Sequence, residues 1–490
     1  MSSPSVRSRE ADSGNPIVLF FNSAISSPDS LALVSARTKL TYRQLARLAR
    51  QTARKLSKLG IKAGDVVGIQ CQPEITVVLW LALLQLGATS LAVTKTTLAS
   101  YGQYINTVLV DDNFSRLKHG RVQTLSPEFF ESLDVTVPLE DIAQLQPESL
   151  VRVVFSSGTT GVPKGVPFNV EVFLARVESA RSNWIPIQPF MSMLGPETVS
   201  GFQTVFAQLF SGNTCYLQSD SSNLWGLIND YGIKSIKTSP AKLADLVRSF
   251  QEGQKSSKME NSLSVIQVAG SLLSKSLATA CEVSLKITPT YLYGSTEVGT
   301  VSRGQFDQSH PNSVGAVISE VEFEIVDEKN HVLPLGQIGL IRARRNPMAQ
   351  SYWKNTLVTS NGFSHGWFYP GDRGVLTSKR ELLLEGRSDD LVNAGGLKVN
   401  LAQLDQALSE LKEVSDVATF EFYGEFGEPL LGLAFTAEGS ADINEIERLA
   451  QLHAPGIRFN ALVRLDSIPR NYLGKVLRKE LTENAQGESN

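Results

Sequence analysis

The chain has 490 residues, more than one hydrophobic core usually supports, so its length predicts at least two domains. Hydrophobic residues make up 42% and charged residues 19%, a composition that is typical of a folded globular protein and excludes an intrinsically disordered one. Lys and Arg total 46 against 49 Asp and Glu, and this balance, with a formal charge of -3, argues against binding to nucleic acid or to an anionic membrane.

The N-terminal part of the chain alternates helix and strand signals. Thr41 and Gln44 form the capping-box pattern Thr-x-x-Gln, and apolar residues follow at helical spacing, which predicts a helix that ends near Gly60. Short apolar runs at 66–69 and 90–93 predict strands. Such alternation is typical of a parallel sheet covered by helices, so we predict an α/β fold.

The stretch 75–93 is uncharged and nearly long enough to cross a bilayer. Polar and small residues interrupt it, and Gly87 is typical of a helix C-cap. We therefore expect a buried helix over 75–86 followed by a strand, and no transmembrane segment. The first sixteen residues lack the apolar core of a secretory signal, which predicts a cytoplasmic protein. Three widely separated cysteines predict reduced, mostly buried thiols: Cys71, Cys215 and Cys281.

The later elements continue the alternation and then change period. From about 313 to 342, apolar residues recur at every second position between glycine turns, which predicts a small antiparallel β module. A polar, charged segment at 386–389 precedes roughly a hundred further residues, a common domain size. We predict a large N-terminal domain of helix-covered sheets, residues 1–386, and a small α+β C-terminal domain, residues 387–490, with a hinge between them.

A loop rich in glycine and hydroxyl groups follows the apolar run at 151–155. Glycines let the backbone approach a polyphosphate closely, and hydroxyls with one ammonium supply hydrogen-bond donors to its oxygens. A plain polar turn explains the serines and glycines but poorly explains Pro-Lys-Gly at the end of the loop. The spacing differs from the common nucleotide P-loop. We predict that these residues bind phosphate: Ser156, Ser157, Gly158, Thr159, Thr160 and Lys164.

The loop resembles the signature of the adenylate-forming (AMP-binding) superfamily, which includes acyl-CoA synthetases, peptide-synthetase adenylation domains and luciferases. Further motifs follow in the family's order over most of the chain. The segment from Tyr293 to Glu297 resembles the second core motif, whose ring stacks on adenine and whose acid holds Mg²⁺. A flat ring suits a purine, and a carboxylate suits Mg²⁺. The resemblance implies nucleotide contacts for Gly270, Tyr293 and Gly294, and catalytic roles for Thr296 and Glu297.

Two further segments resemble the family's ribose and hinge motifs. Asp372 ends a segment whose aspartate accepts hydrogen bonds from the ribose hydroxyls, and a carboxylate is a natural acceptor for a diol. Pro370 stands where the family often has threonine. The resemblance implies that Arg387 lies near the ribose, that Asp389 is the pivot of the hinge, and that Lys398 faces the ATP phosphates.

The segment from Pro469 to Lys475 resembles the C-terminal signature, whose lysine bridges the acyl carboxylate and the α-phosphate. Attack of one anion on another needs a cation to screen the repulsion and stabilise the transition state. Asn471 replaces the family's usual threonine or serine. The resemblance implies a catalytic Lys475, and a mobile C-terminal lid that rotates about Asp389.

The segment 193–201 corresponds to part of the family's acyl pocket but has no histidine. Counted back from Gly212, Val199 takes the place of the aspartate with which peptide synthetases pair an α-ammonium. Burying an unpaired ammonium costs several kcal/mol, so an α-amino acid substrate is disfavoured. Glu197, close by in sequence, is an alternative counter-ion.

The leading hypothesis is ATP-dependent activation of an apolar fatty or aryl acid to an acyl-AMP, followed by transfer to coenzyme A as a thioester. It implies ATP, Mg²⁺ and coenzyme A or phosphopantetheine as cofactors, and a small-molecule carboxylic acid as the substrate. The alternatives are transfer to the phosphopantetheine of an acyl carrier protein or to an amine, and a silent nucleotide-binding homologue. Five residues with proposed roles in binding or catalysis are retained, which argues against a catalytically silent homologue: Lys164, Glu297, Asp372, Arg387 and Lys475.

Overall fold

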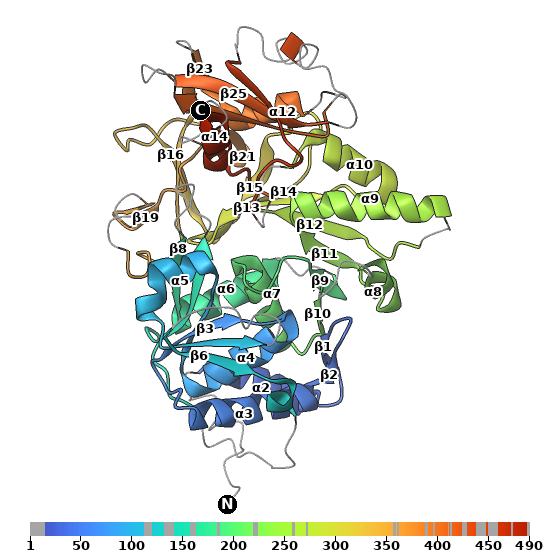
Figure 1. Cartoon of the computed structure of the whole chain (residues 1–490), viewed down its shortest axis with the longest axis vertical. Coiled ribbons are helices and arrows are strands. Elements are labelled where there is room, and N and C mark those ends of the chain that lie inside the picture. The colour runs from blue at the N-terminus through green and yellow to red at the C-terminus, as the bar shows by residue number, and fades with distance from the viewer. Residues whose placement is uncertain are drawn as a thin grey trace, which may run out of the picture.

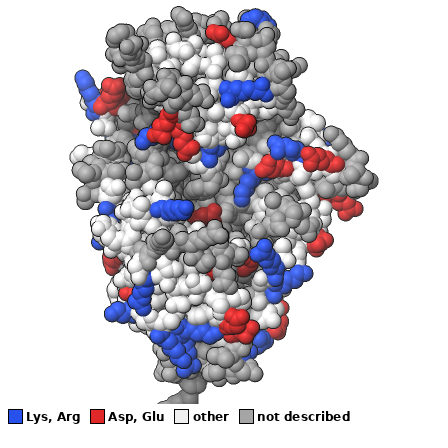
Figure 2. Space-filling view, viewed as in Figure 1, with Lys and Arg blue, Asp and Glu red and all other residues white. Residues whose placement is uncertain are grey.

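The computed structural model shows an elongated molecule with the N-terminal elements at one end and the C-terminal strands at the other (Figure 1). On the face drawn in Figure 2, basic and acidic side chains are interspersed over the described surface. The structure describes residues 15–111, 120–131, 142–156, 163–183, 187–218, 224–256, 260–270, 273–355, 359, 362–387, 391–394, 397–409, 411, 414–423, 429–437, 447–448, 459–471 and 474–487.

The N-terminal elements build a mostly parallel sheet, with order β6-β5-β3-β4-β7-β8 and only β8 antiparallel to its neighbour. Its hydrophobic strands are covered by helices, as predicted for buried parallel strands. The strands are β3 (Val66–Gln70), β4 (Thr89–Ala92), β5 (Thr107–Asp111), β6 (Val122–Leu125), β7 (Leu150–Ser156) and β8 (Lys164–Asn169). The helices up to β8 are α2 (Ile17–Ser26), α3 (Tyr42–Lys58), α4 (Pro73–Leu86) and α5 (Lys95–Tyr101), with 3₁₀ turns at Gly102–Tyr104 and Pro127–Phe130.

Two local predictions for this region are confirmed. Helix α3 begins at the capping box, in which Thr41 and Gln44 each accept a hydrogen bond from the other's backbone N–H. Helix α4 ends at Gly87, which has φ 70° and is the left-handed C-cap. The helix begins two residues earlier than predicted because proline, here Pro73, is well accepted at the first helical position. Among the described residues, no helix is long and apolar enough to cross a membrane.

A large mixed sheet follows, with order β18-β19-β17-β20-β21-β15-β14-β13-β12-β11-β9-β10-β1-β2 and β16 beside β17. Its strands from β10 to β13 are parallel, whereas the pairs from β13–β14 onward are antiparallel. The parallel part contains β1 (Leu31–Val34), β9 (Phe190–Ser192), β10 (Cys215–Leu217), β11 (Ser235–Thr238), β12 (Val265–Ala269) and β13 (Thr290–Ser295), with β2 (Lys39–Thr41) antiparallel at its edge. Its helices are α6 (Val170–Asn183), α7 (Val199–Phe210), α8 (Leu224–Asp230), α9 (Pro240–Ser256) and α10 (Lys275–Leu285).

The predicted antiparallel strands are present, and they extend the large sheet rather than form a sheet of their own. Val321, Phe323 and Ile325 are buried and Glu322 between them is exposed, as the period of two predicts. The strands are β14 (Gly299–Gln305), β15 (Ser313–Val317), β16 (Glu322–Val326), β17 (Gly339–Arg344), β18 (Phe363–Ser364), β19 (Trp367–Phe368), β20 (Asp372–Leu376) and β21 (Glu381–Arg387).

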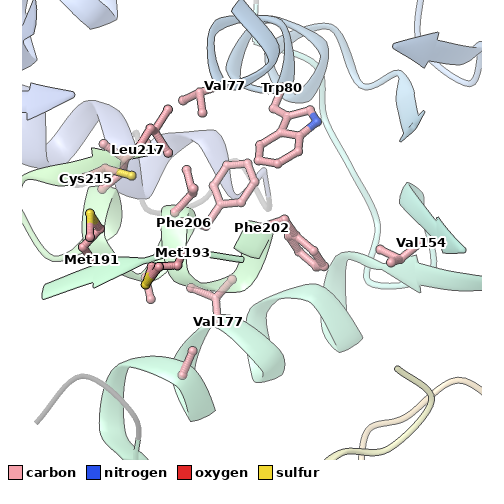
Figure 3. Close-up of a cluster of buried hydrophobic side chains, with 14 of the residues drawn as sticks. Val77, Trp80, Val154, Val177, Met191, Met193, Phe202, Phe206, Cys215 and Leu217 are labelled. Carbon is pink, nitrogen blue, oxygen red and sulfur yellow. The ribbon is translucent and has the colours of Figure 1, made fainter. Parts of the chain in front are cut away.

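Helix α7 lies at the centre of the main hydrophobic core and joins the two sheets. Its Phe202 and Phe206 lie near Trp80 of α4 (Figure 3), with ring centroids 6.4 and 5.7 Å from that of Trp80. Other residues of α7 line a small cavity with β9 and β10, so the helix contacts elements of both sheets. Aromatic packing of this kind buries large apolar areas and fixes the two layers against each other.

The C-terminal residues build a separate three-stranded sheet, β24-β25-β26, and two hydrophobic clusters that contain only residues after 391. Asn400 connects this part to the large sheet, because its Nδ2 donates to the backbone oxygen of Glu385 at 2.9 Å. The elements are β22 (Leu391–Ala394), β23 (Leu397–Asn400), α12 (Leu401–Leu408), β24 (Asp416–Tyr423), β25 (Pro429–Thr436), β26 (Ala461–Arg464) and α14 (Arg478–Gly487).

Candidate active site

The carboxyl ends of the parallel strands bring several predicted residues to one edge of the large sheet. Strands β9, β11, β12 and β13 are parallel and in register, so they end at the same edge. Gly270 follows β12, Tyr293 and Gly294 lie in the last half of β13, and the next turn carries Thr296 and Glu297. Parallel sheets bind ligands at this edge. The backbone of Gly270 has φ 102°, a conformation that glycine adopts without strain.

Asp372 is held between an arginine and a tyrosine. It begins β20 opposite Arg387, the last residue of β21, and Arg387 Nη1 lies 3.1 Å from Asp372 Oδ1. Tyr293 Oη donates to Asp372 Oδ2 at 2.5 Å. Loss of solvent and the nearby carboxylate raise the pKa of Tyr293, so its hydroxyl stays protonated and donates. A carboxylate oxygen can accept more than one hydrogen bond, so this group suits the hydroxyls of a diol.

Glu297 connects the phosphate loop to this edge. Glu297 is buried, with 5% of the residue exposed. Its Oε1 accepts from Tyr352 Oη at 2.9 Å and from Ser156 Oγ at 3.4 Å. Ser156 ends β7 and Lys164 begins β8, so the two residues flank the loop. Lys164 Nζ lies 5.5 Å from the ring centroid of Tyr352. The structure thus brings Ser156, Lys164 and Glu297 around one tyrosine.

The oxygens at this point fit a magnesium ion. Mg²⁺ in proteins is usually bound through one or two carboxylates together with the phosphates of a nucleotide. The Glu297 carboxylate beside the Ser156 hydroxyl is a donor set of this kind, at the start of the predicted phosphate loop. Some predicted site residues lie outside the described residues: Ser157, Gly158, Thr159, Thr160, the predicted pivot Asp389, and the side chain of Lys398. The backbone of Lys398, in β23, pairs with Asn393, in β22.

Sequence reasoning missed two residues next to Glu297. Tyr352 lies outside the sequence motifs. The only signal at this position is that two aromatic residues, Tyr352 and Trp353, are adjacent in the sequence. Burial and the Glu297 carboxylate raise the pKa of Tyr352, so it too remains a hydrogen-bond donor. Arg176, in α6, donates to the backbone oxygens of Glu297 and Val298. Nothing in the sequence distinguishes this arginine from its neighbours.

The loop that carries Lys475 is a tight turn stabilised by Asn471. Asn471 Oδ1 accepts from the backbone N–H of Lys475 at 3.0 Å, and the Asn471 carbonyl accepts from Gly474 at 2.8 Å. A threonine or serine hydroxyl can also accept a hydrogen bond, so the replacement by Asn471 keeps a side-chain acceptor at this position. A Cβ on Gly474 would lie 3.1 Å from Cβ of Ala241, in the first turn of α9. Because α9 follows β11, the loop lies near the same carboxyl edge.

The predicted acyl-pocket segment begins α7. Val199 is its first residue and is half-buried, and the helix is capped by Thr198, whose hydroxyl accepts from Gly201. Glu197 is exposed and folds back over Gly195, where a Cβ would lie 2.1 Å from its Oε1. The Glu197 carboxylate counteracts the effect of burial on the pKa of Lys242.

Comparisons with known proteins identify the family of the chain and its fold. A family model described as AMP-binding enzyme matches residues 20–353. The chain is 25% identical to surfactin synthase subunit 2 of Bacillus subtilis (strain 168) over 94% of its own length but only 14% of that protein. It is 26% identical to 2-succinylbenzoate–CoA ligase of Geobacillus kaustophilus (strain HTA426), covering 94% of this chain and 96% of that one. The structure of O-succinylbenzoate coenzyme A synthetase from Bacillus subtilis, in complex with ATP and magnesium ion, matches the fold with a TM-score of 0.82 at 20% identity, over 94% and 98% of the two chains.

Proposed function

Because the chain belongs to the AMP-binding enzyme family and is an adenylate-forming ligase, we propose that it activates an apolar fatty or aryl acid and transfers the acyl group to coenzyme A. In the first step the acid's carboxylate attacks the α-phosphate of ATP, and pyrophosphate leaves. In the second step the thiol of coenzyme A attacks the acyl carbon, and AMP leaves. The observation that carries the proposal is the meeting of Asp372, Tyr293 and Arg387 at the sheet edge that also carries Glu297.

Each side chain has a role in this proposal that follows from its chemistry. The ring of Tyr293 packs on adenine, while Asp372 and Arg387 bind the ribose. Lys164 and the loop before it bind the phosphates, and Lys475 binds the α-phosphate and the acid's carboxylate. Glu297 holds Mg²⁺, which when bound neutralises phosphate charge.

The acceptor has a second candidate. Identity to surfactin synthase subunit 2 favours transfer to the phosphopantetheine of a carrier protein, whereas coverage of 96% of 2-succinylbenzoate–CoA ligase favours coenzyme A. Transfer to an amine remains a further alternative. A silent homologue is disfavoured, because the residues proposed to bind phosphate and metal are retained and the Ser156 and Tyr352 hydroxyls meet on the Glu297 carboxylate. The cytoplasmic location stays a prediction from the sequence.

A panel of acids tests the function directly. With ATP, Mg²⁺ and a suitable acid, the protein should form acyl-AMP and release pyrophosphate, and added coenzyme A should then convert the acyl-AMP to a thioester and AMP. Medium-chain or aromatic acids should outperform every proteinogenic amino acid, because an α-ammonium beside the half-buried Val199 would be desolvated without a counter-ion. Release of ADP and phosphate would refute the assignment. Preference for an α-amino acid would instead make Glu197 the counter-ion.

We also propose that residues 387–490 form a lid that moves between the two steps. The separate C-terminal sheet and its own hydrophobic clusters support this division. A hinge absorbs a large change in φ and ψ at a few residues, and proline fixes φ near −65°. Asp389→Pro should therefore trap one state. We expect the adenylating state, because the Lys475 loop already lies against Ala241.

The two half-reactions report on the hinge separately. Asp389→Pro should release pyrophosphate in a single turnover at a near-normal rate but form little thioester. The control is Asp389→Ala, which removes the same carboxylate and leaves φ free, and it should support both steps. If the ratio of the two rates is unchanged in the proline variant, Asp389 is not the pivot.

A further inference from the structure

Arg176 is a fully buried cation that binds two consecutive backbone carbonyl groups. It lies in the middle of α6 and is 2% exposed. Its Nη2 donates to the carbonyl oxygen of Glu297 at 2.5 Å, and its Nη1 donates to the carbonyl oxygen of Val298. The planar guanidinium thus spans two consecutive carbonyls, which a single ammonium does less well. These carbonyls belong to the turn between β13 and β14 that presents the Glu297 side chain.

The surroundings show that this arrangement is costly for the fold. Burial lowers the pKa of Arg176, and the second buried cation nearby, Arg345, lowers it further. Arg345 also donates to the Val298 carbonyl at 3.4 Å and pairs with Glu320 at 2.6 Å. Two buried like charges destabilise a protein unless partners compensate them. General stability is therefore a weak explanation for Arg176, and a specific effect on the turn is a better one.

Gly299 gives Arg176 access to the turn. It has φ 90°, and a Cβ at this position would lie 1.6 Å from Arg176 Nη1. The backbone conformation favours glycine, and a Cβ at this position would have to displace the guanidinium. Helix α6 and the hairpin β13–β14 therefore pack closely at Gly299, although they are more than a hundred residues apart in sequence.

We propose that Arg176 is a positioning residue for the magnesium site. By holding the Glu297 and Val298 carbonyls, it fixes the turn so that the Glu297 carboxylate faces Ser156 and the phosphate loop. The Glu297 side chain is then already ordered in the folded protein, so metal binding does not carry the free-energy cost of ordering it. This inference rests on the proposed function, since it takes Glu297 as the ligand of Mg²⁺.

Binding of nucleotides tests the inference without knowledge of the acid. Calorimetry would give the dissociation constants of ATP with and without Mg²⁺, and of AMP. The variant Arg176→Lys keeps the charge but lacks the planar fork. In the unaltered protein, Mg²⁺ should tighten the binding of ATP. In Arg176→Lys this effect of Mg²⁺ on the dissociation constant should be smaller by a factor of about ten or more, the usual size of such effects on metal affinity. AMP affinity should be retained, because the residues around Tyr293 and Asp372 are not touched.

The matched control is Arg152→Lys, since Arg152 is also 2% exposed but its guanidinium contacts the rings of Trp80 and Phe202. It should lower the thermal unfolding temperature and leave the effect of Mg²⁺ unchanged. Gly299→Ala should reproduce the Arg176→Lys result by displacing the guanidinium. A full Mg²⁺ effect in Arg176→Lys, or an equal loss of AMP binding, would overturn the inference. Failure of the unaltered protein to bind ATP would instead refute the proposed function.

Discussion

Lys475→Ala should lower the rate of acyl-AMP formation by a factor of about a hundred to a thousand, the usual effect of removing one group that stabilises transition-state charge. The acid and the α-phosphate are both anions, so without the lysine their repulsion is unscreened in the transition state. The turn itself should survive, because Asn471 Oδ1 accepts from the backbone N–H of Lys475, which an alanine keeps. Pyrophosphate release from ATP and acid measures this step.

The second half-reaction separates a chemical role of Lys475 from a structural one. Thioester formation from chemically supplied acyl-AMP and coenzyme A should proceed at a near-normal rate in Lys475→Ala, because no α-phosphate is attacked in this step. Lys479→Ala is the control, since Lys479 is an exposed lysine four residues further on, next to Glu483. It should leave both steps intact. Equal losses of the two half-reactions in Lys475→Ala would show a folding defect or a general binding role.

Asp372→Ala should weaken ATP and AMP binding by about ten- to a hundredfold, as expected when hydrogen bonds to a charged acceptor are lost. Asp372 receives Tyr293 on one oxygen and Arg387 on the other, so its removal takes away the ribose acceptor and also releases two neighbours. The maximal rate at saturating ATP should fall much less, because the groups at the phosphates remain. Calorimetry with AMP and the KM for ATP measure the two effects.

Tyr293→Phe is the matched comparison for Asp372→Ala. It keeps the ring that packs on adenine and removes only the hydroxyl that donates to Asp372 Oδ2. It should therefore weaken AMP binding less than Asp372→Ala does. If Asp372→Ala binds AMP normally and keeps full activity at limiting ATP, Asp372 is not the ribose acceptor, and the position of the nucleotide must be revised.

The local features of the fold were predictable because they depend on neighbouring residues. A capping box needs only Thr41 and Gln44, and a left-handed C-cap needs only Gly87. The period of two at Val321, Phe323 and Ile325 predicted the strand in the same way. The residue types in the motifs carried the chemistry of the candidate site, since phosphate, ribose and Mg²⁺ each favour particular donors and acceptors.

Other features depend on which distant segments meet, and no local pattern encodes this. Ser156 and Glu297 are 141 positions apart, and Arg176 and Glu297 are 121 apart. The antiparallel strands read as a separate module because periodicity reports the exposure of a strand but not its partner. Asn471 departs from the family's usual threonine or serine, and only the structure shows that its side chain accepts from the backbone N–H of Lys475. The sequence by itself thus determined the elements and the chemical groups, and the tertiary structure decided that Tyr352 and Arg176 hold Glu297, because packing alone brings those segments together.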